Sequence, residues 1–154
     1  MTTTNETKLQ KHDSLANLMS DNSKFKKGST AFQVSVWGTD NQTEKTTVRI
    51  RKLHIESFGK RQGTATAEES GNFIGVNLDP KFSILAHSLD DAKKMAAQLG
   101  LHESAMSIAG SLRCEKSWLD NYSCSAKPAV VAKAKAKIAF LETAKPSFNI
   151  IERN

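Results

Sequence analysis

The chain has 154 residues, of which 38% are hydrophobic and 25% are charged, and its 22 basic and 16 acidic side chains give a net charge of +6. This length fits one domain and argues against a second complete one. No run of about 18 apolar residues occurs, and the first residues lack the basic-then-apolar order of a signal peptide. We therefore expect no membrane span and a cytoplasmic location.

The first thirty residues differ in composition from the rest of the chain. They are rich in Thr, Asn, Ser and Lys and contain few large apolar side chains. This composition predicts a flexible basic N-terminal arm over residues 1–30 and a single α+β domain over residues 31–154. Leu15, Leu18 and Met19 have the spacing of one helical face, so we expect that the arm can fold on a partner.

Several short segments after the arm have the composition of strands and are separated by turn residues. Sequential strands joined by short turns pair antiparallel, which predicts a meander. The predicted strands cover residues 31–37, 46–58, 64–68, 73–78 and 81–87. The apolar tail, residues 147–154, is expected to dock as a strand on a sheet edge.

Helical periodicity replaces strand alternation from residue 88 onward. Ser88 and Asp91 have the spacing of a capping box, and Gly100 has the place of a C-terminal cap. These signals predict a first helix over 88–99 and a second helix that ends near Tyr122. The predicted sheet-facing stripe of the first helix is Leu89, Ala92, Met95, Ala96 and Leu99.

A third helix is bounded by two prolines, because Pro128 suits a first helical turn and Pro146 cannot continue a helix. Its predicted buried stripe is Val131, Ala134, Ile138 and Leu141, and its lysines 133, 135 and 137 are interpreted as a solvated face. The predicted fold class is therefore α+β: an antiparallel four- to five-stranded meander followed by two to three helices packed on one face.

The strongest functional signal is the stretch VRIRKLHIESFGKRQGTAT, residues 48–66. Between Lys45 and Arg61 there are six cations and one anion, Glu56. The clustering of these cations matters because phosphate binding depends on several cations that act together and release counterions.

The apolar residues of this stretch change parity, since Val48 and Ile50 are even and Leu53 and Ile55 are odd. We predict a β-bulge near Arg51 and Lys52, which would keep all four in one core and leave Arg49, Arg51 and His54 on the open face. The alternative is a straight strand that is covered on both sides.

The first functional hypothesis is a non-enzymatic nucleic-acid-binding protein that contacts DNA or RNA with low sequence specificity. The expected contacts are Lys45, Arg49, Arg51, Lys52, Lys60 and Arg61, with Phe58 or Trp37 available for base stacking. The alternative interpretation is that these cations only form the solvent-exposed face of an antiparallel strand, which ordinarily carries alternate Lys and Arg.

The second hypothesis is a protein-interaction module, such as a regulator or inhibitor, that docks through its N-terminal arm or a sheet edge. Homo-oligomerisation is left open.

No catalytic, cofactor-binding or metal-binding motif occurs in the sequence. Cys114 and Cys124 form no C-x-x-C pair, so two free thiols are expected. The repeated H-x-S spacing at His12 and His102 is interpreted as chance. We therefore expect no enzyme, no cofactor and no metal, with a nucleotide-processing enzyme as a third hypothesis.

Overall fold

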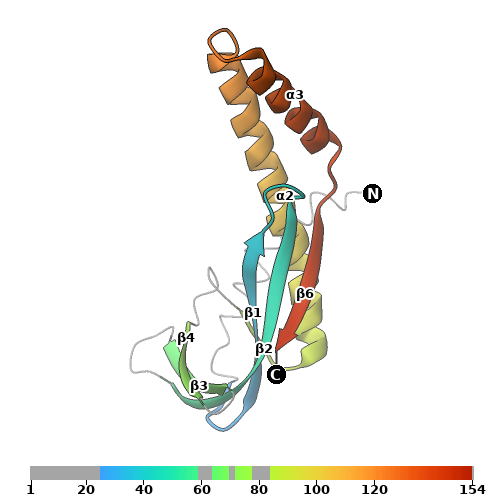
Figure 1. The fold of residues 1–154 in the computed structure, drawn as a ribbon. Coiled ribbons are helices and arrows are strands. Elements are labelled where there is room, and N and C mark those ends of the chain that lie inside the picture. Colours follow the sequence, from blue (N-terminus) through green and yellow to red (C-terminus); the bar gives the residue numbers. More distant parts are fainter. Residues whose placement is uncertain (1–24, 59–63, 70–71, 78–83, 154) are drawn as a thin grey trace.

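The computed structural model describes residues 25–58, 64–69, 72–77 and 84–153, and in them the predicted α+β class is confirmed. Six strands form one mixed sheet, and two helices follow the first five strands (Figure 1). The strands are β1 (Thr30–Thr39), β2 (Lys45–Phe58), β3 (Thr64–Glu69), β4 (Asn72–Asn77), β5 (Ile84–Ala86) and β6 (Ser147–Arg153). The helices are α2 (Leu89–Tyr122) and α3 (Pro128–Thr143).

The order of the strands confirms the meander only in part. Strands β1 to β4 pair sequentially and antiparallel, but β5 pairs with β1 instead of β4. The C-terminal strand β6 pairs with β2 in parallel, from Lys45 opposite Ser147 to Arg51 opposite Arg153. One edge of β2 is therefore shared by β6 and β3, and the sheet is mixed where a purely antiparallel one was predicted.

The N-terminal half of α2 covers one face of the sheet, as its predicted stripe indicated. Ser88 caps the helix, because its Oγ accepts a hydrogen bond from the backbone N–H of Asp91 at 3.1 Å. Leu89 and Met95 are partly buried against the core of the sheet. The fully buried part of this contact comprises Ala92, Ala96 and Leu99 on α2 with Val34, Val48, Ile50 and Ile84 on the sheet.

The prediction that a helix ends at Gly100 is wrong, because α2 continues without interruption to Tyr122. Gly100 does not cap a helix; it allows a close packing contact. A Cβ added at Gly100 would lie 2.5 Å from Cβ of Phe148 on β6. The glycine therefore allows the parallel strand to approach the helix, which a local helix-end rule does not anticipate.

The second half of α2 extends beyond the sheet and pairs with α3 to form a helical hairpin (Figure 1). Of the predicted α3 stripe, Ala134 and Leu141 are buried. The prediction that all helices pack on one face of the sheet is wrong for α3, which packs mainly on α2. No helix among the described residues has the length and apolar character needed to cross a membrane.

Residues 25–30, which were predicted to belong to the N-terminal arm, pack on the domain. The Phe25 side chain is buried in the core, and its ring stacks on His87 with centroids 4.0 Å apart. Backbone hydrogen bonds join Gly28 and Ser29 to Ile55. The rest of the predicted arm, residues 1–24, lies outside the described residues.

The loop between β1 and β2 is tied to both helices and to β6. Glu44 is only 1% exposed and has a positive φ of 60°. One of its carboxylate oxygens, Oε2, accepts a hydrogen bond from Ser107, and its carbonyl accepts one from Ser104 Oγ at 2.5 Å. Ser104 Oγ also accepts the backbone N–H of Ser147 at 3.0 Å, and Lys137 Nζ donates to the carbonyl of Asn41 at 3.2 Å. This junction holds the β1–β2 hairpin in one orientation relative to α2.

Ser104→Ala is expected to lower the free energy of unfolding by about 1–3 kcal/mol, because it leaves the buried Glu44 carbonyl and the Ser147 N–H without this partner. Urea denaturation followed by circular dichroism measures the change. Ser117→Ala on the exposed part of α2 is the control, with an expected change within about 0.5 kcal/mol. Equal stability of the two variants would contradict the role given to the junction.

Candidate nucleic-acid interface

Whether β2 is bulged or straight near Arg51 and Lys52 decides on which face of the sheet its cations lie. The predicted bulge at this position is wrong. The register between β1 and β2 is continuous from Thr30 opposite His54 to Val36 opposite Val48. A strand without a bulge alternates faces at every residue. Leu53 and Ile55 are buried as expected, but on the face opposite to Val48 and Ile50.

The strand is therefore covered on both sides, in different halves. Val48 and Ile50 face α2, whereas Leu53 and Ile55 are buried on the other face together with Ala31, which lies opposite Leu53. The strand covered on both sides, which was the alternative expectation, accounts for the change of parity, because the register against β1 is regular from Val48 to His54. The irregularity that β2 shows against β3 comes later, between Ile55 and Ser57.

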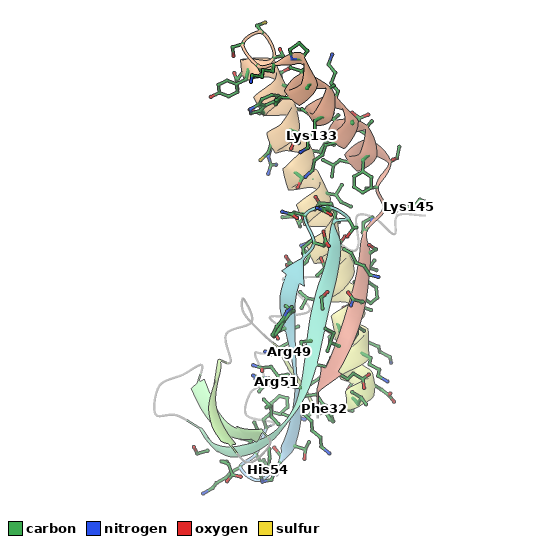
Figure 2. The ribbon with its side chains drawn as sticks, in the orientation of Figure 1. Phe32, Arg49, Arg51, His54, Lys133 and Lys145 are labelled. Carbon is green, nitrogen blue, oxygen red and sulfur yellow. The ribbon has the colours of Figure 1, made fainter. Side chains whose placement is uncertain are left out.

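The predicted basic patch is consequently divided. Arg49 and Arg51 (Figure 2) share with Lys45 the face that points away from α2. Lys52 lies on the other face with His54, whose Nε2 is 3.5 Å from Glu56 Oε1. Lys60 and Arg61 lie outside the described residues, as does the side chain of Phe58. The structure thus brings together three of the seven predicted site residues.

An irregularity does occur in the neighbouring strand, at Trp37. The register of β1 against β2 shifts between Val36 and Gly38, so Trp37 is the extra residue of a β-bulge. Bulges re-aim a side chain at the edge of regular pairing. The Trp37 ring is 60% exposed, and the Arg49 guanidinium carbon lies 4.6 Å from its centroid. This distance is that of a cation–π contact, which stabilises an exposed pair by about 0.5–1 kcal/mol.

Arg51 is held by a second side chain of β1. Its Nε and one terminal nitrogen both donate to Oε1 of Gln33, at 3.2 and 2.5 Å, and Gln33 lies directly opposite in the sheet. Gln33 is 7% exposed, so its amide is fixed by its surroundings. The guanidinium is therefore positioned before any ligand arrives.

We call this surface the Trp37 face and define it by Gln33, Ser35, Trp37, Lys45, Thr47, Arg49 and Arg51. Next to it on β6, Asn149 accepts a hydrogen bond from Thr47 Oγ1 at 2.9 Å, and Ile151 is exposed. The sequence indicated Trp37 as one of two residues available for base stacking. It gave no role to Gln33, although strict alternation in AFQVSVW places Gln33, Ser35 and Trp37 on one side.

The described residues contain no group of three potential metal ligands. Cys114 and Cys124 are free and exposed. His102 is buried in α2, and Ser104, its neighbour in the H-x-S spacing, is used by the Glu44 junction. His12 lies outside the described residues.

Comparison of the chain with protein-family models gives no match, and comparisons with curated proteins and with solved structures give none either.

Proposed function

We propose that the protein binds nucleic acid without catalysing a reaction, through the Trp37 face and with low sequence specificity. The observation that carries the proposal is the exposed Trp37 ring with the Arg49 guanidinium 4.6 Å from its centroid, on the sheet face that α2 leaves free. Aromatic rings stack on nucleobases of any sequence, and guanidinium groups bind phosphates.

The geometry favours a single strand as the ligand. A base can stack on a protein side chain only where it is not already stacked within a duplex, so an exposed tryptophan on a sheet selects unpaired bases. With a base on the Trp37 ring, the adjoining phosphates lie near Arg49, Arg51 and Lys45. The net charge of +6 adds a general attraction for a polyanion.

A matched pair of variants on β2 tests this proposal. Arg49→Ala and Lys52→Ala each remove one positive charge, from opposite faces of the same strand. For a fluorescent single-stranded oligonucleotide, we expect Arg49→Ala to reduce the slope of log K against log salt by about 0.7, the value for one phosphate contact. Lys52→Ala should leave the slope unchanged. Equal effects of the two variants, or binding that does not weaken with salt, would reject the Trp37 face as the interface.

A second candidate function is protein interaction through a sheet edge, and β6 supports it. Among the described strands, β6 pairs only with β2, so the other side of this seven-residue strand offers backbone groups for strand addition. Recovery of one stoichiometric protein partner after nuclease treatment would favour this function over nucleic-acid binding.

A further inference from the structure

The helical hairpin formed by α2 and α3 exposes more apolar surface than a solvated structural element requires. Tyr122, Val130 and Phe140 are 54%, 46% and 44% exposed, and all three belong to this hairpin. On α3, only Ala134 and Leu141 are buried. Exposed apolar side chains that gather in one place are typical of a surface that another molecule covers, and on this hairpin Val130 lines a hollow together with Trp118, which Tyr122 adjoins.

A groove runs between the two helices on one side of the hairpin. It has a volume of about 560 Å³. Trp118 contributes an aromatic wall from α2, and Tyr122, one turn further on, has its ring centroid 6.1 Å from that of Trp118. The lining residues are Cys114, Glu115, Trp118, Val130, Lys133, Ala134 and Lys137.

The α3 wall of this groove has an ordered pattern. Val130, Lys133 and Lys137, which line the groove, are spaced by three and four residues, and Phe140 continues the same helical stripe three residues beyond the lining. Two apolar side chains thus bracket two lysines. The stripe is about 15 Å long, since each helical residue rises about 1.5 Å.

The charge of this region is one-sided. From Lys127 to Lys145 there are five lysines and one acidic residue, Glu142. Glu142 is already used, because its Oε1 lies 3.6 Å from Lys116 Nζ. Within the described part of the chain, neither Lys133 nor Lys137 is paired with a carboxylate. A partner that fills the groove therefore meets Lys133 and Lys137, of which Lys137 also donates to the Asn41 carbonyl, and a single carboxylate, that of Glu115.

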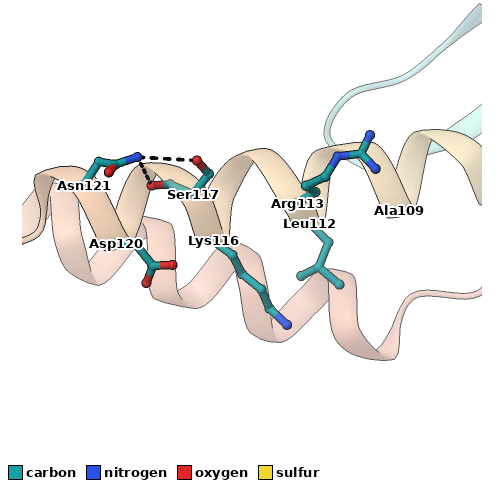
Figure 3. Close-up of a pocket in the computed structure, with 7 residues that line it drawn as sticks. All are labelled: Ala109, Leu112, Arg113, Lys116, Ser117, Asp120 and Asn121. Carbon is teal, nitrogen blue, oxygen red and sulfur yellow. Dashed lines mark hydrogen bonds between the residues drawn. The ribbon is translucent and has the colours of Figure 1, made fainter.

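A second hollow, on the exposed side of α2, lacks these features (Figure 3). It has a volume of about 610 Å³ and is lined by α2 alone. Its charges are mixed, with Arg113 and Lys116 beside Asp120, and it contains no aromatic side chain. Of these two hollows, the groove is the one that combines an aromatic wall, Trp118, with two lysines, Lys133 and Lys137, that form no salt bridge with a carboxylate of the described residues.

We propose that the groove between α2 and α3 binds an acidic amphipathic helix of a partner protein. Such a helix would place apolar side chains on Val130 with Trp118 and on Phe140, and carboxylates on Lys133 and Lys137. This is the helix-in-groove mode, in which apolar anchors provide affinity and charges fix the orientation. The proposal is independent of nucleic-acid binding, because it uses none of the residues of the Trp37 face.

Tryptophan fluorescence tests this proposal directly. The chain has two tryptophans, so Trp37→Phe leaves Trp118 as the reporter inside the groove. The probe is a synthetic helical peptide of about 15 residues, with leucines along one face and glutamates beside them. A matched peptide carries glutamine at every glutamate position.

We expect the acidic peptide to shift the Trp118 emission to shorter wavelength and to bind at least about tenfold more tightly than the glutamine peptide. Lys133→Glu with Lys137→Glu should weaken binding by at least about tenfold, whereas Lys135→Glu, exposed on another side of α3, should change it by less than about threefold.

Four results would overturn the proposal. The first is no emission shift at millimolar peptide, and the second is an equal loss of binding in Lys135→Glu. The third is displacement of the peptide by a single-stranded oligonucleotide in the Trp37→Phe background, since the groove would then be a general polyanion site. Concentration-dependent self-association that disappears in Lys133→Glu with Lys137→Glu would likewise assign the groove to a second copy of the chain.

Discussion

Replacing Trp37 with alanine is expected to weaken binding of a single-stranded oligonucleotide by about 5- to 150-fold, because one base-stacking contact contributes about 1–3 kcal/mol. The ring is 60% exposed and makes its closest described polar contact with Arg49, so its removal opens no cavity in the core. Fluorescence anisotropy with a labelled oligonucleotide, at fixed salt, measures the change in affinity.

Two controls separate stacking from folding and from charge. Trp37→Phe keeps an aromatic ring and should retain most of the affinity, and both variants should unfold within about 1 kcal/mol of the unmodified protein. Lys52→Ala removes a charge on the opposite face and should bind as well as the unmodified protein. An affinity for the oligonucleotide that is unchanged in Trp37→Ala would contradict the proposed role of the ring.

The second large effect is expected at Gly100, where alanine should lower the free energy of unfolding by about 1–3 kcal/mol. Intrinsic helix propensity alone predicts the opposite sign, because alanine is favoured over glycine by about 1 kcal/mol in a helix interior. The added Cβ would lie 2.5 Å from Cβ and 2.8 Å from Cγ of Phe148, and these atoms are close to the backbone of β6 and cannot move freely. We therefore expect the clash to decide the sign.

Gly110, in the same helix, provides the matched control. A Cβ at Gly110 meets only the end of the Arg113 side chain, at 4.0 Å. Gly110→Ala should therefore raise the free energy of unfolding by up to about 1 kcal/mol. Urea denaturation of both variants gives the comparison, and a stabilised Gly100→Ala protein would show that β6 does not pack on α2 as described.

The sequence predicted correctly those helices and strands whose signals lie within a few neighbouring residues. The Ser88 cap, the stripe from Leu89 to Leu99 and the two prolines around α3 all depend on spacings of a few residues. Alternation in AFQVSVW gave β1, and the apolar tail gave β6. Each of these signals is complete within the element it describes.

Contacts between segments far apart in the chain decided the features that the sequence did not predict, namely the course of α2 past Gly100 and the pairing of β5 and β6. Gly100 has the same local signature as a helix end, and its close contact with Phe148, 48 positions later, gives a reason for a glycine inside a continuous helix. The pairing of β5 with β1 and of β6 with β2 joins segments far apart in the chain, for which alternation carries no partner information.

The face of the sheet on which each cation of β2 lies depended on a choice that the sequence left open. A change of apolar parity in VRIRKLHI fits both a bulged strand with one core and a straight strand with two. A straight strand covered on both faces is the arrangement observed, because Leu53 and Ile55 are buried beside Ala31 on the face opposite to Val48 and Ile50. The bulge itself lies in β1 at Trp37, and it turns this residue toward Arg49.

The central claim is that nucleic acid contacts the Trp37 face, and ultraviolet crosslinking to a single-stranded oligonucleotide tests it most directly. Digestion and mass spectrometry then identify the protein segment that carries the crosslinked nucleotide. Our account predicts a crosslink within β1 at Trp37 that is lost in Trp37→Ala. Crosslinks confined to the lysines of α3, or none at low salt, would contradict it.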